Sequence, residues 1–66
     1  MDMNEVRVFL KNEGFNYKKI KHSIADKRVI VYVDFISYML RFLKILSTEY
    51  KLRKVKKVNN VIFKFI

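Results

Sequence analysis

The chain has 66 residues, which suits one domain with a thin core, and 52% of them are apolar, which excludes a disordered tail. It has no cysteine, so disulfides and thiolate metal sites are excluded as reinforcement. Fifteen Lys and Arg against six Asp and Glu give a net charge of +9, and a field of this sign attracts phosphate or anionic lipid.

The first expected element is a helix over residues 3–13. One apolar face recurs at helical spacing and consists of Met3, Val6, Phe9 and Leu10. Asp2 followed by Glu5 is a capping-box pattern, which marks the start of a helix. Gly14 is the only glycine, and it stands where a helix that ends near Glu13 needs a left-handed residue.

A hairpin is expected next. Residues 15–24 alternate as a strand does, with a change of parity near Lys18 and Lys19 that indicates a bulge or a twist. Residues 25–27 form the turn. Residues 29–33 are a run of β-branched and aromatic side chains, which is typical of a central strand covered on both faces.

Residues 35–49 then show a helical pattern with one narrow polar stripe, made of Ser37, Arg41, Lys44 and Thr48. Nearly every other residue of this helix is apolar, which is more than one sheet can cover. We therefore expect it to contact a neighbouring protein or a second copy of the chain. The residues expected at that interface are Phe35, Tyr38, Met39, Phe42, Leu43 and Leu46.

The rest of the chain has the pattern of a second hairpin. Residues 50–58 form a lysine-rich strand, Asn59-Asn60 suits a two-residue turn, and residues 61–66 form an apolar strand. The predicted fold is thus α+β, a helix–hairpin–helix–hairpin (αββαββ), with a mainly antiparallel sheet and the helices packed on one face.

We expect residues 1–66 to form a single domain. Shifting the sequence by 33 residues aligns residues 9–11 with 42–44, and Tyr17-Lys18 with Tyr50-Lys51. Because the expected elements repeat in the same order, the chain is a candidate for a duplicated αββ unit, over about residues 1–33 and 34–66.

The sequence has few side chains that could form a catalytic site. His22 is the only histidine, the six acids are scattered, and a glycine-rich phosphate loop cannot be built around one glycine. We expect no enzyme activity, no catalytic residues, no metal and no cofactor. Asp34, Arg41 and Lys44 interrupt the most apolar stretch, so we expect no membrane span.

The basic residues gather in two segments, each beside a tyrosine that could stack on a base. The first contains Tyr17, Lys18, Lys19, Lys21, Lys27 and Arg28, and the second contains Tyr50, Lys51, Arg53, Lys54, Lys56 and Lys57. If both hairpins belong to one sheet, these residues form a continuous strip that follows a phosphate backbone. Protection of edge strands explains a few lysines but not ten cations in two segments. We therefore expect them to bind nucleic acid.

Part of the sequence resembles a known family. The run Glu5–Phe15, with Lys19–Ser23 and Lys27–Val33, looks like the helix–hairpin portion of the bacterial-type small-subunit ribosomal protein of the eighth family. Residues 52–58 and 61–65 are similar to its next basic strand pair. The family's first helix and its C-terminal Ser-Thr-Ser domain, which contacts RNA, have no counterpart here. The resemblance implies binding to ribosomal RNA.

These patterns predict a small basic RNA-binding protein that is a structural component of a ribosome. Abundant Lys, Asn, Ile, Tyr and Phe indicate an AT-rich genome, as in an organelle, and the acidic start at residues 1–5 is unlike a signal peptide. We therefore expect an intracellular location, with a mitochondrion or other organelle as a candidate. Two alternatives stay open: a small DNA-binding or dsRBD-like regulator from a virus or plasmid, and a structural subunit without nucleic acid.

Overall fold

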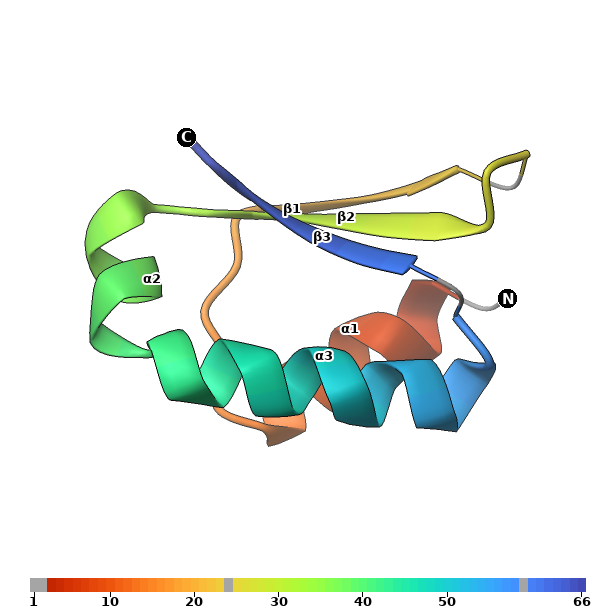
Figure 1. The fold of residues 1–66 in the computed structure, drawn as a ribbon, viewed down its shortest axis with the longest axis horizontal. Helices are drawn as coiled ribbons and strands as arrows, with labels where there is room; N and C mark the ends of the chain where they lie inside the picture. The colour runs from red at the N-terminus through yellow and green to blue at the C-terminus, as the bar shows by residue number, and fades with distance from the viewer. Residues whose placement is uncertain (1–2, 24, 59) are drawn as a thin grey trace.

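Two layers make up the fold, a three-stranded sheet and the helices packed against one of its faces (Figure 1). The structure is a computed structural model that describes residues 3–23, 25–58 and 60–66. Its elements, in chain order, are α1 (Met3–Asn12), β1 (Lys19–Ser23), β2 (Arg28–Val33), α2 (Phe35–Leu40), α3 (Phe42–Lys56) and β3 (Asn60–Phe65). The predicted α+β class is confirmed.

The strand β2 lies at the centre of the sheet. β1 pairs with it antiparallel, with Ile20 opposite Val31, and β3 pairs with it parallel, with Val61 opposite Val29. Parallel neighbours need a crossover connection, and α2 and α3 supply it. The predicted αββαββ order is therefore wrong in its second half, where the chain runs helix, helix, strand. The two halves of the chain differ in element order, so the order gives a duplicated unit no support.

The segment predicted as a lysine-rich strand, residues 50–58, is mostly the continuation of α3. Ile45, Thr48 and Leu52 are almost fully buried and recur at spacings of three and four, which is the period of a helix. Lys, Arg and Leu are good helix formers, and no glycine or proline interrupts the segment. This buried helical row was missed in the sequence because Thr48 was assigned to the polar stripe, whereas Thr48 is fully buried in the structure.

The predicted helix over residues 35–49 is broken at Arg41. Arg41 has φ −122° and ψ 26°, and its N–H donates to the carbonyl oxygens of Ser37 and Tyr38, both at 3.2 Å. Its side chain donates to the carbonyl oxygen of Gly14 at the end of α1. The break lets α2 turn at one end of the molecule while α3 runs back beneath the sheet (Figure 1).

The end of α1 is as predicted. Gly14 has φ +70°, its N–H donates to the Lys11 carbonyl at 2.9 Å, and the Phe15 N–H donates to the Leu10 carbonyl at 2.9 Å. This pair of bonds is a Schellman motif, which satisfies carbonyls that the helix end leaves open. Phe15 and Leu10 are both buried, and so the motif also places an apolar contact under the turn.

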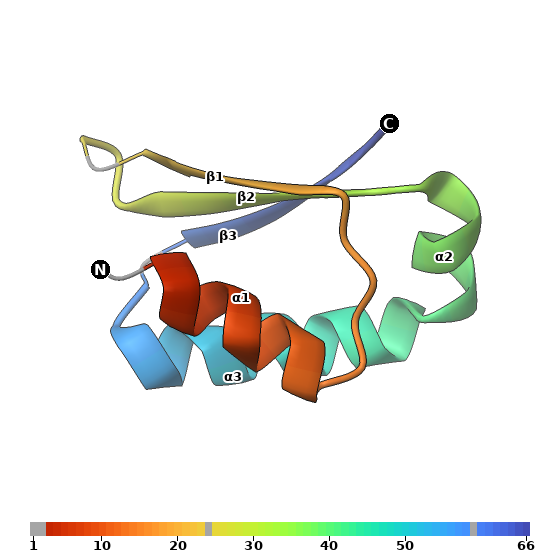
Figure 2. The same cartoon turned by 180° about the vertical axis from the view of Figure 1, so that it is seen from behind.

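The core lies between the sheet and the helices. Val29, Val31 and Val33 of β2 are fully buried and face Leu10 of α1 and Leu52 of α3 in one cluster. Figure 2, seen from behind, shows the helices on the same side of the sheet as Figure 1 does. The expectation that the central strand is covered on both faces is wrong, because β2 carries its alternate side chains on an uncovered face.

The first strand is shorter than predicted. β1 begins at Lys19, and the segment before it brings Phe15 into the core and packs Tyr17 partly against it. Asp2 of the predicted capping box, Ile24 at the predicted strand end and Asn59 of the predicted turn lie outside the described residues.

Candidate nucleic-acid interface

The outer face of the sheet, on the side away from the helices, presents three rows of side chains. On each strand, residues that alternate with the inward-pointing core residues point to this outer face. The register then aligns them across the three strands. Each row has one residue from β1, one from β2 and one from β3. The rows are Ser23–Arg28–Asn60, Lys21–Ile30–Ile62 and Lys19–Tyr32–Lys64. We call these nine residues the outer face.

An aromatic ring stands between two lysines in the last row. Tyr32 is partly exposed in the central strand, with Lys19 opposite it on β1 and Lys64 opposite it on β3. The Lys19 Nζ lies 5.8 Å from the centroid of the Tyr32 ring. Both lysines are exposed. A planar base stacked on this ring would have a cation on each side for its phosphates.

The outer face holds four cations, Lys19, Lys21, Arg28 and Lys64, and its nine residues include no carboxylate. Two acids lie near its ends, and each accepts a hydrogen bond from a serine. Asp26 accepts from the Ser23 Oγ at 3.2 Å, and Asp34 accepts from the Ser37 N–H at 2.8 Å. The Asp34 carboxylate caps α2, and the hydrogen bonds from Ser37 hold the pKa of Asp34 below its usual value. The positive charge of the outer face is therefore not neutralised within the face.

The second basic segment lies elsewhere, on α3 in the helix layer. Lys51 lies 3.3 Å from the Glu13 carboxylate, Arg53 lies 2.7 Å from Glu49, and the Lys54 Nζ lies 5.1 Å from the Tyr50 ring centroid. Lys57 follows the helix with a left-handed backbone (φ 54°), and the side chain of Lys56 is outside the description.

Glu13 joins α1 to α3 through two lysines. Lys44 and Lys51 both reach its carboxylate, at 3.4 and 3.3 Å. Burial raises the pKa of Glu13, but the hydrogen bonds and charges of Lys51 and Lys44 outweigh this and lower the pKa below its usual value. Two cations of the second segment, Lys51 and Arg53, thus already pair with acids inside the chain.

The predicted continuous strip does not form, because its condition, both segments in one sheet, is not met. Lys19, Lys21 and Arg28 lie on the sheet, and Lys18 and Lys27 flank its strands, whereas the second segment lies on a helix. A role of either segment in binding stays a prediction. Sequence reasoning missed Tyr32 and Lys64. The alternation within residues 29–33 could have found Tyr32, since it separates Ile30 and Tyr32 from the three valines.

The residues predicted as a protein interface lie at the α2 end of the molecule. Five of them are large exposed apolar side chains, namely Phe35, Met39, Phe42, Leu43 and Leu46. Tyr38 is partly buried and sits edge-on to Phe42 and Phe65, with ring centroids 6.0 and 4.7 Å apart. No side chain of α2 is buried, so this short helix is an apolar projection from the fold.

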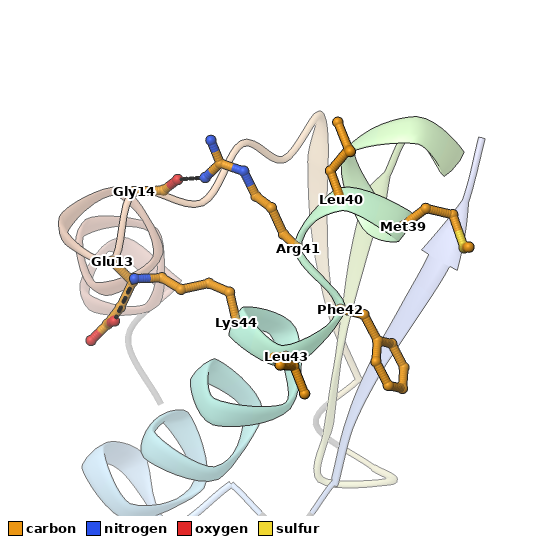
Figure 3. Close-up of a pocket in the computed structure, with 8 residues that line it drawn as sticks. All are labelled: Glu13, Gly14, Met39, Leu40, Arg41, Phe42, Leu43 and Lys44. Carbon is orange, nitrogen blue, oxygen red and sulfur yellow. Dashed lines mark hydrogen bonds and ion pairs between the residues drawn. The ribbon is translucent and has the colours of Figure 1, made fainter.

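A hollow lies where the end of α1 meets the α2–α3 junction (Figure 3). Arg41 crosses it to the Gly14 carbonyl, and Lys44 reaches Glu13. Its polar groups are thus engaged in joining the helices. Within residues 3–23, 25–58 and 60–66, no three His, Asp or Glu side chains gather as a metal site would need. Over the same residues, no helix is both long and apolar enough to cross a membrane.

Comparison of the chain with models of protein families, with curated proteins and with solved structures gives no match.

Proposed function

We propose that this protein binds single-stranded RNA on the outer face of its sheet. The observation that carries the proposal is the row Lys19–Tyr32–Lys64, a partly exposed aromatic ring between two cations on a face without acids. Phosphates supply most of the affinity in such complexes, and stacking on an aromatic side chain adds about 1–3 kcal/mol per base.

The shape of the surface favours single strands. A three-stranded sheet face is broader than the helix or two-stranded ribbon that enters the major groove of a duplex, whereas unpaired bases can lie flat on a partly exposed ring. Ile30 and Ile62 extend the apolar floor beside Tyr32, and Lys21 stands at its rim. Asn60 offers an amide that can hydrogen-bond a ribose 2′-hydroxyl, the group that separates RNA from DNA.

A place in a ribosome stays a prediction, and it depends on the resemblance of residues 5–33. The DNA-binding regulator and the structural subunit are the outcomes that the experiment below distinguishes from RNA binding.

The test compares two variants that lose the same charge. One replaces Lys19, Lys21 and Lys64 of the outer face by Ala, and the other replaces Lys51, Lys54 and Lys57 of the α3 region. Affinity for a fluorescent single-stranded RNA is titrated at several salt concentrations. Each phosphate contact on a single strand contributes about −0.7 to the slope of log K against log salt, so the outer-face variant should lose about two units of slope. The α3 variant should keep most of it.

Equal losses in the two variants would show that only net charge matters, and would contradict the proposed site. Tighter binding to matched single-stranded DNA or to duplex RNA would reassign the ligand. No binding to any of the three at low salt would leave the structural subunit as the remaining alternative.

A further inference from the structure

The two edges of the sheet differ in how they are protected. β1 carries Lys19 and Lys21 and is preceded by Lys18, and charged residues of this kind keep edge strands from pairing with other chains. β3 forms the other edge, with β2 as its one neighbour among the described strands. It has a single charge, Lys64, and no proline over its six residues.

The free side of β3 presents backbone groups that suit another strand. The Ile66 N–H donates to the Val33 carbonyl at 3.1 Å, so the even-numbered residues of the strand direct their backbone groups to β2. Alternation then directs the N–H and C=O groups of Val61, Phe63 and Phe65 away from β2. These three residues form the open edge.

Next to this edge lies a side of α3 with balanced charge. Phe42, Leu46, Glu49 and Arg53 recur at spacings of four, three and four, and therefore share one side of the helix. The opposite side carries Lys44 and Lys51, which reach Glu13. Figure 1 shows α3 and β3 in front together, and Figure 3 shows Phe42 and Met39 on the β3 side of the junction and Lys44 on the α1 side.

The exposed groups on this β3 side of α3 are apolar or paired. Phe42 is 47% exposed and Leu46 is 49% exposed, while Arg53 and Glu49 neutralise each other at 2.7 Å. In a chain with a net charge of +9, two copies repel over most of their surface. On this side of α3 two copies can meet without that repulsion. Glu49 of one copy can also pair with Arg53 of the other across a two-fold axis.

We propose that the β3 edges of two copies pair antiparallel, so that two three-stranded sheets become one and the β3 sides of the two α3 helices cover each other. A two-fold interface uses the same patch twice, as an edge strand with one flanking helix allows. The pairing would join the two outer faces into one basic surface. The proposal does not depend on RNA binding, since it concerns the edge and not the outer face.

The first test measures the oligomeric state of the full chain by sedimentation equilibrium over roughly micromolar to hundred-micromolar concentrations, without nucleic acid. The expected species is a dimer of twice 8.1 kDa. Leu46→Glu places an unpaired charge in the interface and should raise the dimer dissociation constant by about tenfold or more. Val55→Glu is the matched control, because Val55 is 53% exposed and lies on the α1 side of α3, beside Val8 and Phe9. Circular dichroism verifies that both variants fold.

The second test asks whether the strands pair. Amide hydrogen exchange followed by NMR should show protection of Val61, Phe63 and Phe65 that rises with protein concentration, while Ile62 and Lys64, bonded to β2, are protected at all concentrations. A charge-reversal pair gives an independent readout. Glu49→Arg should weaken the dimer, and Glu49→Arg with Arg53→Glu should restore it.

A monomer at every concentration would overturn the proposal, as would equal weakening by Val55→Glu and Leu46→Glu. A dimer whose Val61, Phe63 and Phe65 amides exchange freely would also overturn it, because the contact would then not be an edge pairing.

Discussion

The two lysine-rich segments, residues 17–28 and 50–57, look alike in the sequence and have different surroundings in the structure. In the first, Lys19, Lys21 and Arg28 stand on an uncovered sheet face without carboxylates. In the second, Lys51 and Arg53 pair with Glu13 and Glu49. The cations of the first segment that stand on the sheet are therefore accessible to a ligand. In the second segment, the Lys51–Glu13 pair joins α3 to α1, and the Arg53–Glu49 pair lies within α3.

The difference shows that charge density along a chain does not measure a binding surface. What matters is which face the cations share and whether acids stand within a few ångströms of them. Tyr32 and Lys64 belong to the first surface although they are far from Lys19 in sequence, because the sheet register brings them into its row.

Leu52→Ala tests whether the second segment is anchored in the helix layer. Leu52 is fully buried, so its truncation should cost about 2–5 kcal/mol of unfolding free energy. Tyr50→Ala is the control. Tyr50 is 60% exposed on the same helix and should change stability by less than about 0.5 kcal/mol. Urea unfolding of both variants measures the difference. Similar small losses of unfolding free energy in the two variants would mean that residues 50–57 do not pack as α3. The contrast between the two lysine-rich segments would then be wrong.

Tyr32→Ala compares the two tyrosines as stacking platforms. Loss of the Tyr32 ring should weaken binding of single-stranded RNA by about 1–3 kcal/mol, while Tyr50→Ala should leave the affinity nearly unchanged. Fluorescence anisotropy with a short oligonucleotide gives both values. Tyr32→Phe keeps the ring and should bind like the parent chain. An equal loss for Tyr32→Ala and Tyr50→Ala would make the two segments equivalent.

Gly14→Ala addresses the turn that carries the chain from α1 toward the first segment. An added Cβ would meet no atom within 4 Å, so the cost comes from the left-handed backbone alone and should be about 1 kcal/mol. Gly14→Asn should cost less, because asparagine tolerates this conformation better. Thermal unfolding of the two variants gives the order. A more stable alanine variant would refute the turn.

Asp34 gives the smallest effect and depends on pH. The pKa of its carboxyl is lowered in the folded chain by hydrogen bonds from Ser37, so its stabilising contribution is complete above the ordinary pKa of about 3.9 and is lost as the pH falls through the folded pKa. Asp34→Ala should lower the melting temperature at about pH 7, where the Asp34 carboxyl is ionised. In strong acid the melting temperatures of the variant and the parent chain should converge. Asp34→Asn keeps the capping acceptor and should lie between them. A difference that is constant with pH would contradict the assignment.

Much of the first half was predictable because its signals are local. Gly14 after an apolar helical face predicts a left-handed helix end, and residues 29–33 predict a strand, since both depend on neighbours within a few positions. The second half was mispredicted where two local patterns conflicted. Exposed lysines occur on edge strands as well as on helices, and the segment was assigned to a strand although Lys, Arg and Leu are good helix formers. Recognising Thr48 as buried, in line with Ile45 and Leu52, would have identified the helix.

Local patterns along the chain were enough to predict the α+β class, the end of α1 at Gly14 and the change from strand to helix at Asp34, and the charge follows directly from the composition. The tertiary structure decided the parallel pairing of β3, the break at Arg41 and the assembly of the outer face. The physical reason is that sheet order and register depend on which strands meet after the chain has crossed between layers. That crossing brings Lys64 to Tyr32, and no spacing along the chain encodes their approach.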